Sequence, residues 1–336
     1  MPLTKYGDIS PRTAGYAAKE MLKRAMPHLV LERFGQAKPL PGSSSKVIIF
    51  RRYEALDHTP VALVEGVTPK GKKLTHTDVS AELEQFGDYV SWTDVIEDTH
   101  EDPVLQEAMG ITGEQAAQLI EVMRWNKLKA GSNVFYANGA DRNVVNKPIC
   151  LSTQRKVTRF LKRQNAKKMT KVVKSSHLFG TEAVAPSFIG LVHSDCEADI
   201  RAMPGFTPVE KYGSMTPYES EIGKVEDVRY VYSTIFEPWE SAGGAKGSGR
   251  TEMLSTGGTN ADVYPVLYLA QDAYGLVPLK GRFAISPLVH NPKVSDSDPL
   301  AQRGHVGWKS MQTAVILNDM WMVRVEAGVT ANPSGC

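Results

Sequence analysis

The segment from Gly66 to Lys73, GVTPKGKK, is the stretch whose residue types and spacing come nearest to a chemical motif. It differs by one residue from the phosphate-binding loop of nucleotide-dependent enzymes, in which a glycine-rich backbone surrounds the phosphates and a final Ser or Thr binds magnesium. Lys73 stands where that Ser or Thr would be. The alternating residues from Leu74 predict a strand, whereas a phosphate loop leads into a helix whose first amides face the anion. We therefore interpret the segment as a turn between strands, with a nucleotide-binding enzyme as the less favoured alternative.

Two other groups contain metal-binding side chains, but neither supplies a full ligand set. His193 and Cys196 give two ligands, where a structural zinc site needs four and a catalytic one needs three. The acidic run from Asp94 to Asp102 lacks the glycine and the terminal Glu of a calcium-binding loop. Acids ahead of a helix are explained by the helix dipole. Because nucleophile, zinc-protease and dinucleotide motifs are also missing, we expect no enzyme, with no catalytic residue, no cofactor and no metal site.

A basic run without any acid lies between Arg155 and Lys174. On a helix expected from Ser152 to about Gln164, several of these cations share one face, and such a stripe can neutralise phosphates without reading base sequence. The alternative is a solvated face or one paired with acids, which is the usual role of a charge run. The candidate DNA-facing residues are Arg155, Arg159, Lys162, Arg163, Lys167 and Lys168.

The composition is that of an ordinary globular protein of two lobes or one elaborated domain. The chain has 336 residues, of which 42% are hydrophobic, and 39 basic residues against 37 acidic ones give a net charge of +2. The longest apolar run, Val263 to Ala270, is far shorter than the roughly 20 residues that span a bilayer, and the N-terminus has no secretory core. We therefore expect no membrane partner and synthesis in the cytoplasm. Three scattered cysteines predict no disulfide framework.

The N-terminal third predicts an arm followed by an extended loop. Residues 1–45 contain one short helix, interrupted at Pro27, and end in a Pro- and Ser-rich stretch. Residues 46–92 read as two strands joined by a turn at Gly66, and an isolated two-stranded ribbon is only marginally stable in water. The extended loop therefore needs a neighbour to lie on. The candidate inter-subunit residues are Glu65, Gly66, Lys70, Lys72 and Lys73.

The rest of the chain mixes helices and strands, which gives the class α+β. A helix of about 40 Å is expected over 104–130, with a kink or break at Gly110 and Gly113. One long strand is expected over 225–236, and a flexible glycine-rich surface loop over 240–260. The last apolar stretches, within 307–325, predict a hairpin that turns at Asn318-Asp319.

An ordered series of short blocks resembles the major capsid protein family of the tailed phages, in particular podovirus N-four and its relatives. The resemblance covers about residues 30–240 and a segment near 274–278. The blocks are Phe34–Gln36, Phe50–Tyr53, Glu65–Pro69, Gly87–Val90, Asp94–Glu107, Gly113–Ala117, Ala130–Val134, Tyr136–Asn138, Pro186–Gly190, Asp199–Arg201, Val209–Gly213, Val231–Thr234 and Tyr274–Pro278.

The resemblance implies a Hong Kong 97-type capsid fold in five parts. These are an N-terminal arm (1–45), an extended β-hairpin loop (46–92), a peripheral domain with a spine helix (93–147), an axial domain (148–300) and a C-terminal hairpin that returns to the peripheral domain (301–336).

The resemblance also implies a function and partners. The chain would assemble with itself, through pentamers and hexamers, into an icosahedral head around double-stranded DNA that it binds without sequence preference. Scaffold, portal and decoration proteins are further expected partners, and assembly would take place in the host cytoplasm. A cellular nanocompartment shell of the encapsulin type is the alternative with the same fold.

Overall fold

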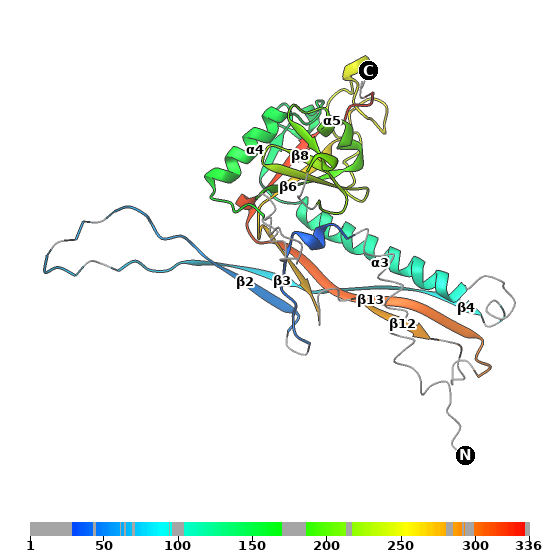
Figure 1. Cartoon of the computed structure of the whole chain (residues 1–336). Helices are drawn as coiled ribbons and strands as arrows, with labels where there is room; N and C mark the ends of the chain where they lie inside the picture. The colour runs from blue at the N-terminus through cyan, green and yellow to red at the C-terminus, as the bar shows by residue number, and fades with distance from the viewer. Residues whose placement is uncertain are drawn as a thin grey trace.

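The computed structural model of the chain describes residues 29–42, 45–60, 62–63, 65–68, 71–93, 95, 104–169, 186–212, 217–279, 285–290, 292 and 299–332. Figure 1 shows two lobes built on sheets and a narrow ribbon that projects away from them. The mixture of helices and strands confirms the α+β class. The helix expected ahead of Pro27 lies outside the described residues. None of the helices in the described part is long and apolar enough to span a membrane.

The upper lobe in Figure 1 is a sheet with the strand order β5-β14-β10-β6-β9-β8-β7. Its strands are β5 Val134–Tyr136, β6 Phe188–His193, β7 Phe206–Pro208, β8 Glu221–Val225, β9 Val228–Ser233, β10 Tyr264–Leu269 and β14 Met322–Ala327. One face packs on α4 (Leu151–Arg163) and the short helix α5 (Glu197–Arg201). The other face packs on the end of α3 (Val104–Leu128) and on residues 30–34. Because both faces are covered, β6 and β10 are apolar and buried almost throughout.

The second lobe is a sheet in the order β1-β11-β13-β12, with β4 on the opposite edge of β13. Its strands are β1 Gln36–Ala37, β4 Glu84–Thr93, β11 Tyr274–Pro278, β12 Ile285–His290 and β13 Arg303–Ile316. Helix α3 runs along this sheet (Figure 1), and its Met109 lies in one core cluster with Trp92 and Trp308. The helix is continuous through Gly110 and Gly113, so the expected break is wrong. Packing on the sheet outweighs the penalty of about 1 kcal/mol for each helical glycine.

The last two strands, β13 and β14, do not form the C-terminal hairpin that the sequence predicts. They lie in different sheets. Strand β13 already has β4 on one edge and β11 and β12 on the other, and β14 lies between β5 and β10. With both edges of each strand occupied, the two strands cannot pair with each other. The turn at Asn318, whose side chain accepts the Met320 amide at 3.2 Å, therefore connects the two lobes.

The ribbon consists of β2 (Val47–Tyr53), β3 (His76–Glu82) and the connecting residues 54–75. The two strands pair antiparallel along their whole length, as the extended-loop prediction requires for this part of the chain. The prediction is wrong for the residues after the ribbon, because β4 pairs with β13 instead of continuing it. Leu83, between β3 and β4, is fully buried in a cluster with Ile48 and ends the ribbon at the body. The five-part division of the chain stays a prediction.

Glu226 and Asp227 form a tight turn where the sequence predicts one long strand. Strands β8 and β9 pair with Val225 opposite Val228, which leaves a two-residue loop. Glu226 has a φ of 51°, a positive value of the kind that two-residue hairpin turns need. Because apolar residues stand on both sides of this turn, the sequence pattern there looks like one continuous strand. The turn presents two carboxylates beside helix α4.

The glycine-rich residues 240–260, expected as a flexible surface loop, are hydrogen-bonded to their surroundings. The Gly243 amide donates to the Ala261 carbonyl oxygen, and the Gly244 amide donates to that of Val145, each at 2.9 Å. A Cβ atom at Gly243 would lie 2.4 Å from the Val145 oxygen, so this close backbone approach requires glycine. The segment is therefore built onto the upper lobe.

Candidate assembly surfaces and basic helix face

The ribbon exposes an unusual number of large apolar side chains. In β2, Ile48 and Phe50 are buried against the body, while the alternate residues face solvent. The exposed set on the ribbon is Val47, Ile49, Tyr53, Leu56, Leu63, Val67 and Leu74. Leu63 keeps 76% of its surface accessible. Soluble monomers rarely expose a series of this kind, so the ribbon is a candidate contact surface.

Local hydrogen bonds hold the outer part of the ribbon. Glu54 accepts from the hydroxyls of Thr77 and Thr75 at 2.9 Å each, and these bonds lower the pKa of the Glu54 carboxyl. The Lys72 ammonium donates to the Asp57 carbonyl oxygen. These partners all belong to the ribbon itself, so its outer part is shaped without support from the two lobes.

The described members of the candidate inter-subunit set lie at or near the ribbon tip, where the chain reverses direction. Glu65 and Gly66 form the turn, and Gly66 has a φ of 78°. Lys73 is exposed on the returning side, and Lys70 lies outside the described residues. From Gly71 the chain runs without a helix into β3. The phosphate-loop alternative fails here, because no helix N-terminus follows the glycines.

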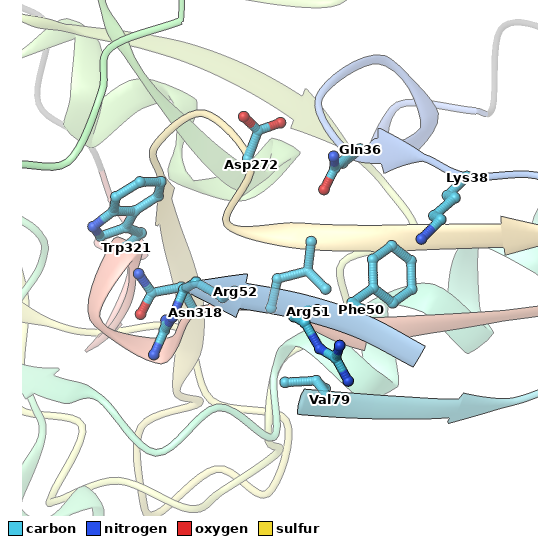
Figure 2. Close-up of a pocket in the computed structure, with 10 residues that line it drawn as sticks. Gln36, Lys38, Phe50, Arg51, Arg52, Val79, Asp272, Asn318 and Trp321 are labelled. Atoms are coloured by element: carbon cyan, nitrogen blue, oxygen red, sulfur yellow. The ribbon is translucent and has the colours of Figure 1, made fainter. Parts of the chain in front are cut away.

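A hollow of about 310 Å³ lies where the base of the ribbon meets both lobes. Figure 2 shows that its lining comes from β1, the ribbon strands β2 and β3, the turn between β10 and β11, and the connection from β13 to β14. Phe50, Leu317 and Trp321 supply apolar surface, and Lys38 and Arg52 supply charge. Sequence patterns could not predict this hollow, because its lining residues come from segments that lie up to more than 200 positions apart.

Half of the predicted basic stripe, on α4 and the residues just after it, is paired with the β8–β9 turn. Arg155 lies 2.5 Å from Glu226, and the pKa of that carboxyl is lowered chiefly by the hydrogen bond from Arg155. Lys162 and Lys168 both reach Asp227, at 2.5 and 3.0 Å, and the Lys162 bond is the main cause of the lowered pKa of Asp227. Glu226 and Asp227 lie about 70 positions after Arg155 in the chain, within the stretch that was expected to be one long strand. Sequence periodicity alone could not have found them.

The other half of the stripe is exposed and free of acids. Arg159, Arg163 and Lys167 have no ion pair within the described residues, and neither has Lys156 on the same exposed side of α4. Seven cations from Arg155 to Lys168 thus meet two carboxylates. This surface therefore keeps a net positive charge. The cations left unpaired are not the same set as the cations that helical spacing alone places on one face.

A buried polar cluster fixes residues 30–32 against helix α3. Glu121 of α3 accepts hydrogen bonds from the amides of Val30 and Leu31 at 3.0 and 2.7 Å. Beside it, Arg124 lies 3.5 Å from Glu32 and donates to Gln312 at 2.9 Å. Burial raises the pKa of Glu121 to about 7. The sequence interpretation missed this cluster, because the contacting residues lie about 90 and 190 positions apart.

His193 and Cys196, rejected as a metal site, have separate surroundings. His193 Nδ1 accepts the Asp195 amide at 3.2 Å. Cys196 is buried in the core of the upper lobe, where burial raises the pKa of its thiol. No group of three or more His, Cys, Asp and Glu side chains gathers as a metal site in the described part of the chain.

A comparison with known protein families shows to which family this chain belongs. Residues 77–325 match the family model described as phage capsid protein. The chain belongs to the phage capsid protein family. The expected kinship with the major capsid proteins of tailed phages is confirmed, and the narrower likeness to the N-four group stays a prediction.

Solved capsids of low sequence identity share the fold of this capsid protein. The capsid of Ralstonia phage GP4 is 10% identical with a TM-score of 0.64, over 89% of this chain and 88% of that one. The cyanophage Pam1 capsid asymmetric unit is 12% identical with a TM-score of 0.63, over 89% of each chain. The head of Helicobacter pylori bacteriophage KHP40 is 12% identical with a TM-score of 0.57, over 87% of each. No curated protein matches the chain.

The expected Hong Kong 97-type fold is thereby confirmed. This capsid protein is a structural subunit of the virion shell that associates with its own copies, and not an enzyme. The family match favours a phage coat over the nanocompartment alternative. Its surfaces, and not a catalytic cleft, are therefore where function lies.

Proposed function

We propose that this capsid protein builds an icosahedral head from pentamers and hexamers and encloses double-stranded DNA. Closed symmetry lets one contact, repeated by every subunit, stabilise the whole shell. Scaffold, portal and decoration proteins are further proposed partners, and assembly is proposed to occur in the host cytoplasm.

The single observation that carries the proposal is the ribbon with its exposed apolar side chains. Seven large apolar residues between Val47 and Leu74 face solvent, on a two-stranded ribbon that projects from the body (Figure 1). Full burial of one such side chain contributes about 1.5–3 kcal/mol, whereas an exposed ion pair contributes about 0.2–1 kcal/mol. Covering the ribbon with a neighbouring subunit would therefore supply most of the contact energy.

Shortening the ribbon tests this role. Residues 56–73 are replaced by Asn-Gly, which favours a two-residue turn between β2 and β3. We expect the shortened chain to keep the thermal stability of the subunit and to sediment as a monomer where the full chain forms large particles. Particles of wild-type size and yield from the shortened chain would contradict the proposal.

The exposed half of the basic stripe is the proposed DNA-facing surface. Arg159, Arg163 and Lys167, with Lys156 beside them, supply cations that no carboxylate of the described chain neutralises. Such cations bind phosphates through counterion release and carry no base specificity. In the nanocompartment alternative, purified particles would contain enzyme cargo in place of nuclease-protected DNA.

A further inference from the structure

A second hollow, called here the upper hollow, lies beside the glycine-rich segment 240–260, whose role the shell-forming function does not explain. Figure 1 shows this segment, in yellow, at the top of the upper lobe. The lining comes from residues 146–148, from the turn within 245–253 and from Thr330. The upper hollow measures about 460 Å³, which lies in the range of roughly 300–1,000 Å³ for sites that bind small molecules.

Backbone contacts among these segments fix the shape of the upper hollow. The Gly328 amide donates to the Lys147 carbonyl oxygen at 2.9 Å, and Met253 and Thr330 pair across an antiparallel β-bridge. The turn itself depends on Gly247, whose φ of 78° favours glycine. Because the chain already holds this shape, a ligand would not have to order the backbone around it.

The lining of the upper hollow is positively charged. It contains three cations, Lys147, Lys246 and Arg250, and no acid. Lys246 lies 2.9 Å from Glu252 beside the hollow, whereas Lys147 and Arg250 have no ion pair within the described residues. A second carboxylate, that of Asp199, accepts a backbone amide at 3.0 Å. Like charges gathered around one hollow repel one another, and a bound anion relieves that repulsion.

We propose that the upper hollow binds phosphate groups, with Lys147 and Arg250 as their principal partners. An arginine guanidinium donates two parallel hydrogen bonds to phosphate oxygens, and a lysine ammonium attracts them as a point charge. A free polyanion and the DNA backbone both offer such groups. The site is separate from the ribbon and from the exposed face of α4, so it does not depend on the proposed shell-forming function.

Isothermal titration calorimetry of the full chain with sodium tripolyphosphate tests the site. Wild type is expected to show saturable binding that weakens as the salt concentration rises. Changing Lys147 and Arg250 together to Gln should weaken this binding by roughly tenfold for each lost cation. The control changes Lys127 and Lys211, two exposed cations outside the upper hollow, to Gln and should bind as wild type does. Wild type without saturable binding, or equal losses in the two double variants, would overturn the proposal.

Two glycine variants separate a shaped site from a simple excess of charge. Gly247 and Gly258 both have a φ of 78°, so alanine strains the backbone similarly at the two positions. A Cβ atom at Gly247 would lie 3.0 Å from the Thr251 carbonyl oxygen, whereas nothing lies within 4 Å of a Cβ atom at Gly258. Gly247→Ala should weaken tripolyphosphate binding severalfold with every charge kept, and Gly258→Ala should leave it unchanged. Equal affinities of the two variants would contradict a shaped site.

A short DNA duplex identifies the source of the phosphate groups. The duplex is titrated into wild type and into the variant in which Lys147 and Arg250 are changed to Gln. If the ligand is a free polyanion, the two proteins should bind the duplex equally. If it is the DNA backbone, the variant should bind the duplex more weakly, and tripolyphosphate should compete with the duplex on wild type. Either result supports the site when tripolyphosphate binding is lost in the variant. A variant that keeps wild-type affinity for both anions would overturn it.

Discussion

At the scale of single residues, Glu121 ties the start of the described chain to helix α3. Its Oε1 atom accepts two backbone amides, while its Oε2 atom is buried without a hydrogen-bond partner in the described residues. A buried carboxyl in such surroundings keeps its proton more readily than one in water. We therefore expect the packing of residues 30–34 on α3 to depend on pH.

Glu121→Gln should remove this dependence. Burial raises the pKa of Glu121 from 4.5 to about 7 in the folded protein, so between these values the folded state binds more protons than the unfolded state. The wild-type free energy of unfolding therefore falls as pH rises through this window. The Gln variant keeps an oxygen for the two amides and cannot ionise. From about pH 5 to pH 8 it should lose less stability than wild type, by on the order of 2–3 kcal/mol in urea titrations of the unassembled subunit. Parallel pH profiles would show that Glu121 does not titrate in this way.

Gly304 permits close packing between β13 and β4. A Cβ atom there would lie 2.5 Å from the Trp92 ring, which is itself buried. Gly304→Ala is expected to destabilise the subunit by about 1–3 kcal/mol, measured by chemical denaturation, because the indole must shift. Gly71→Ala is the matched control, since nothing lies within 4 Å of a Cβ atom at Gly71. Equal stability of the two variants would refute this packing role.

At the scale of elements, some cations of α4 and of the residues that follow it form ion pairs within the subunit, and others are free for the proposed DNA contact. The triple change of Arg159, Arg163 and Lys167 to Gln should lower the DNA content of particles and leave the thermal stability of the subunit unchanged. Its DNA binding should also show a shallower salt dependence, by about one unit of slope for each lost phosphate contact.

The matched control for this prediction changes the paired cations Arg155, Lys162 and Lys168 to Gln. This control should reduce thermal stability, because it leaves Glu226 and Asp227 without their partners. Unchanged DNA content and salt dependence in the first variant would exclude α4 as the DNA-facing surface.

Sequence periodicity predicted most elements but few of their partners. A side chain that faces the core is apolar, so covered faces leave a pattern within each short stretch of sequence. This pattern is the apolar spacing in α3 and α4 and the apolar run in β6 and β10, and it could be recognised locally. Strand β4 was misassigned because its alternation is the same whether it pairs with β2 or with β13. Strands β13 and β14 resembled a hairpin because a turn joins them, although both edges of each are occupied by other strands.

The candidate site was predictable only in part, for a related reason. The basic residues of α4 stand together in the sequence, but Glu226 and Asp227 reach them through tertiary structure. The tip at Glu65 was singled out as a turn, whereas the hollow at the base of the ribbon is assembled from five separate segments.

At the scale of the whole molecule, the subunit has a folded body and a ribbon that its own body covers only at the base. Most core clusters lie in the two lobes, one joins the base of the ribbon to the body, and the ribbon carries seven of the large exposed apolar side chains. A protein of the phage capsid family with this distribution is completed by its neighbours, and its contacts repeat from subunit to subunit.

Electron cryo-microscopy of the purified chain tests this account most directly. We predict closed shells built of pentamers and hexamers, in which the ribbon of each subunit lies on the next. A chain that stays a monomer at high concentration, with no rings or shells even when scaffold protein is supplied, would contradict it.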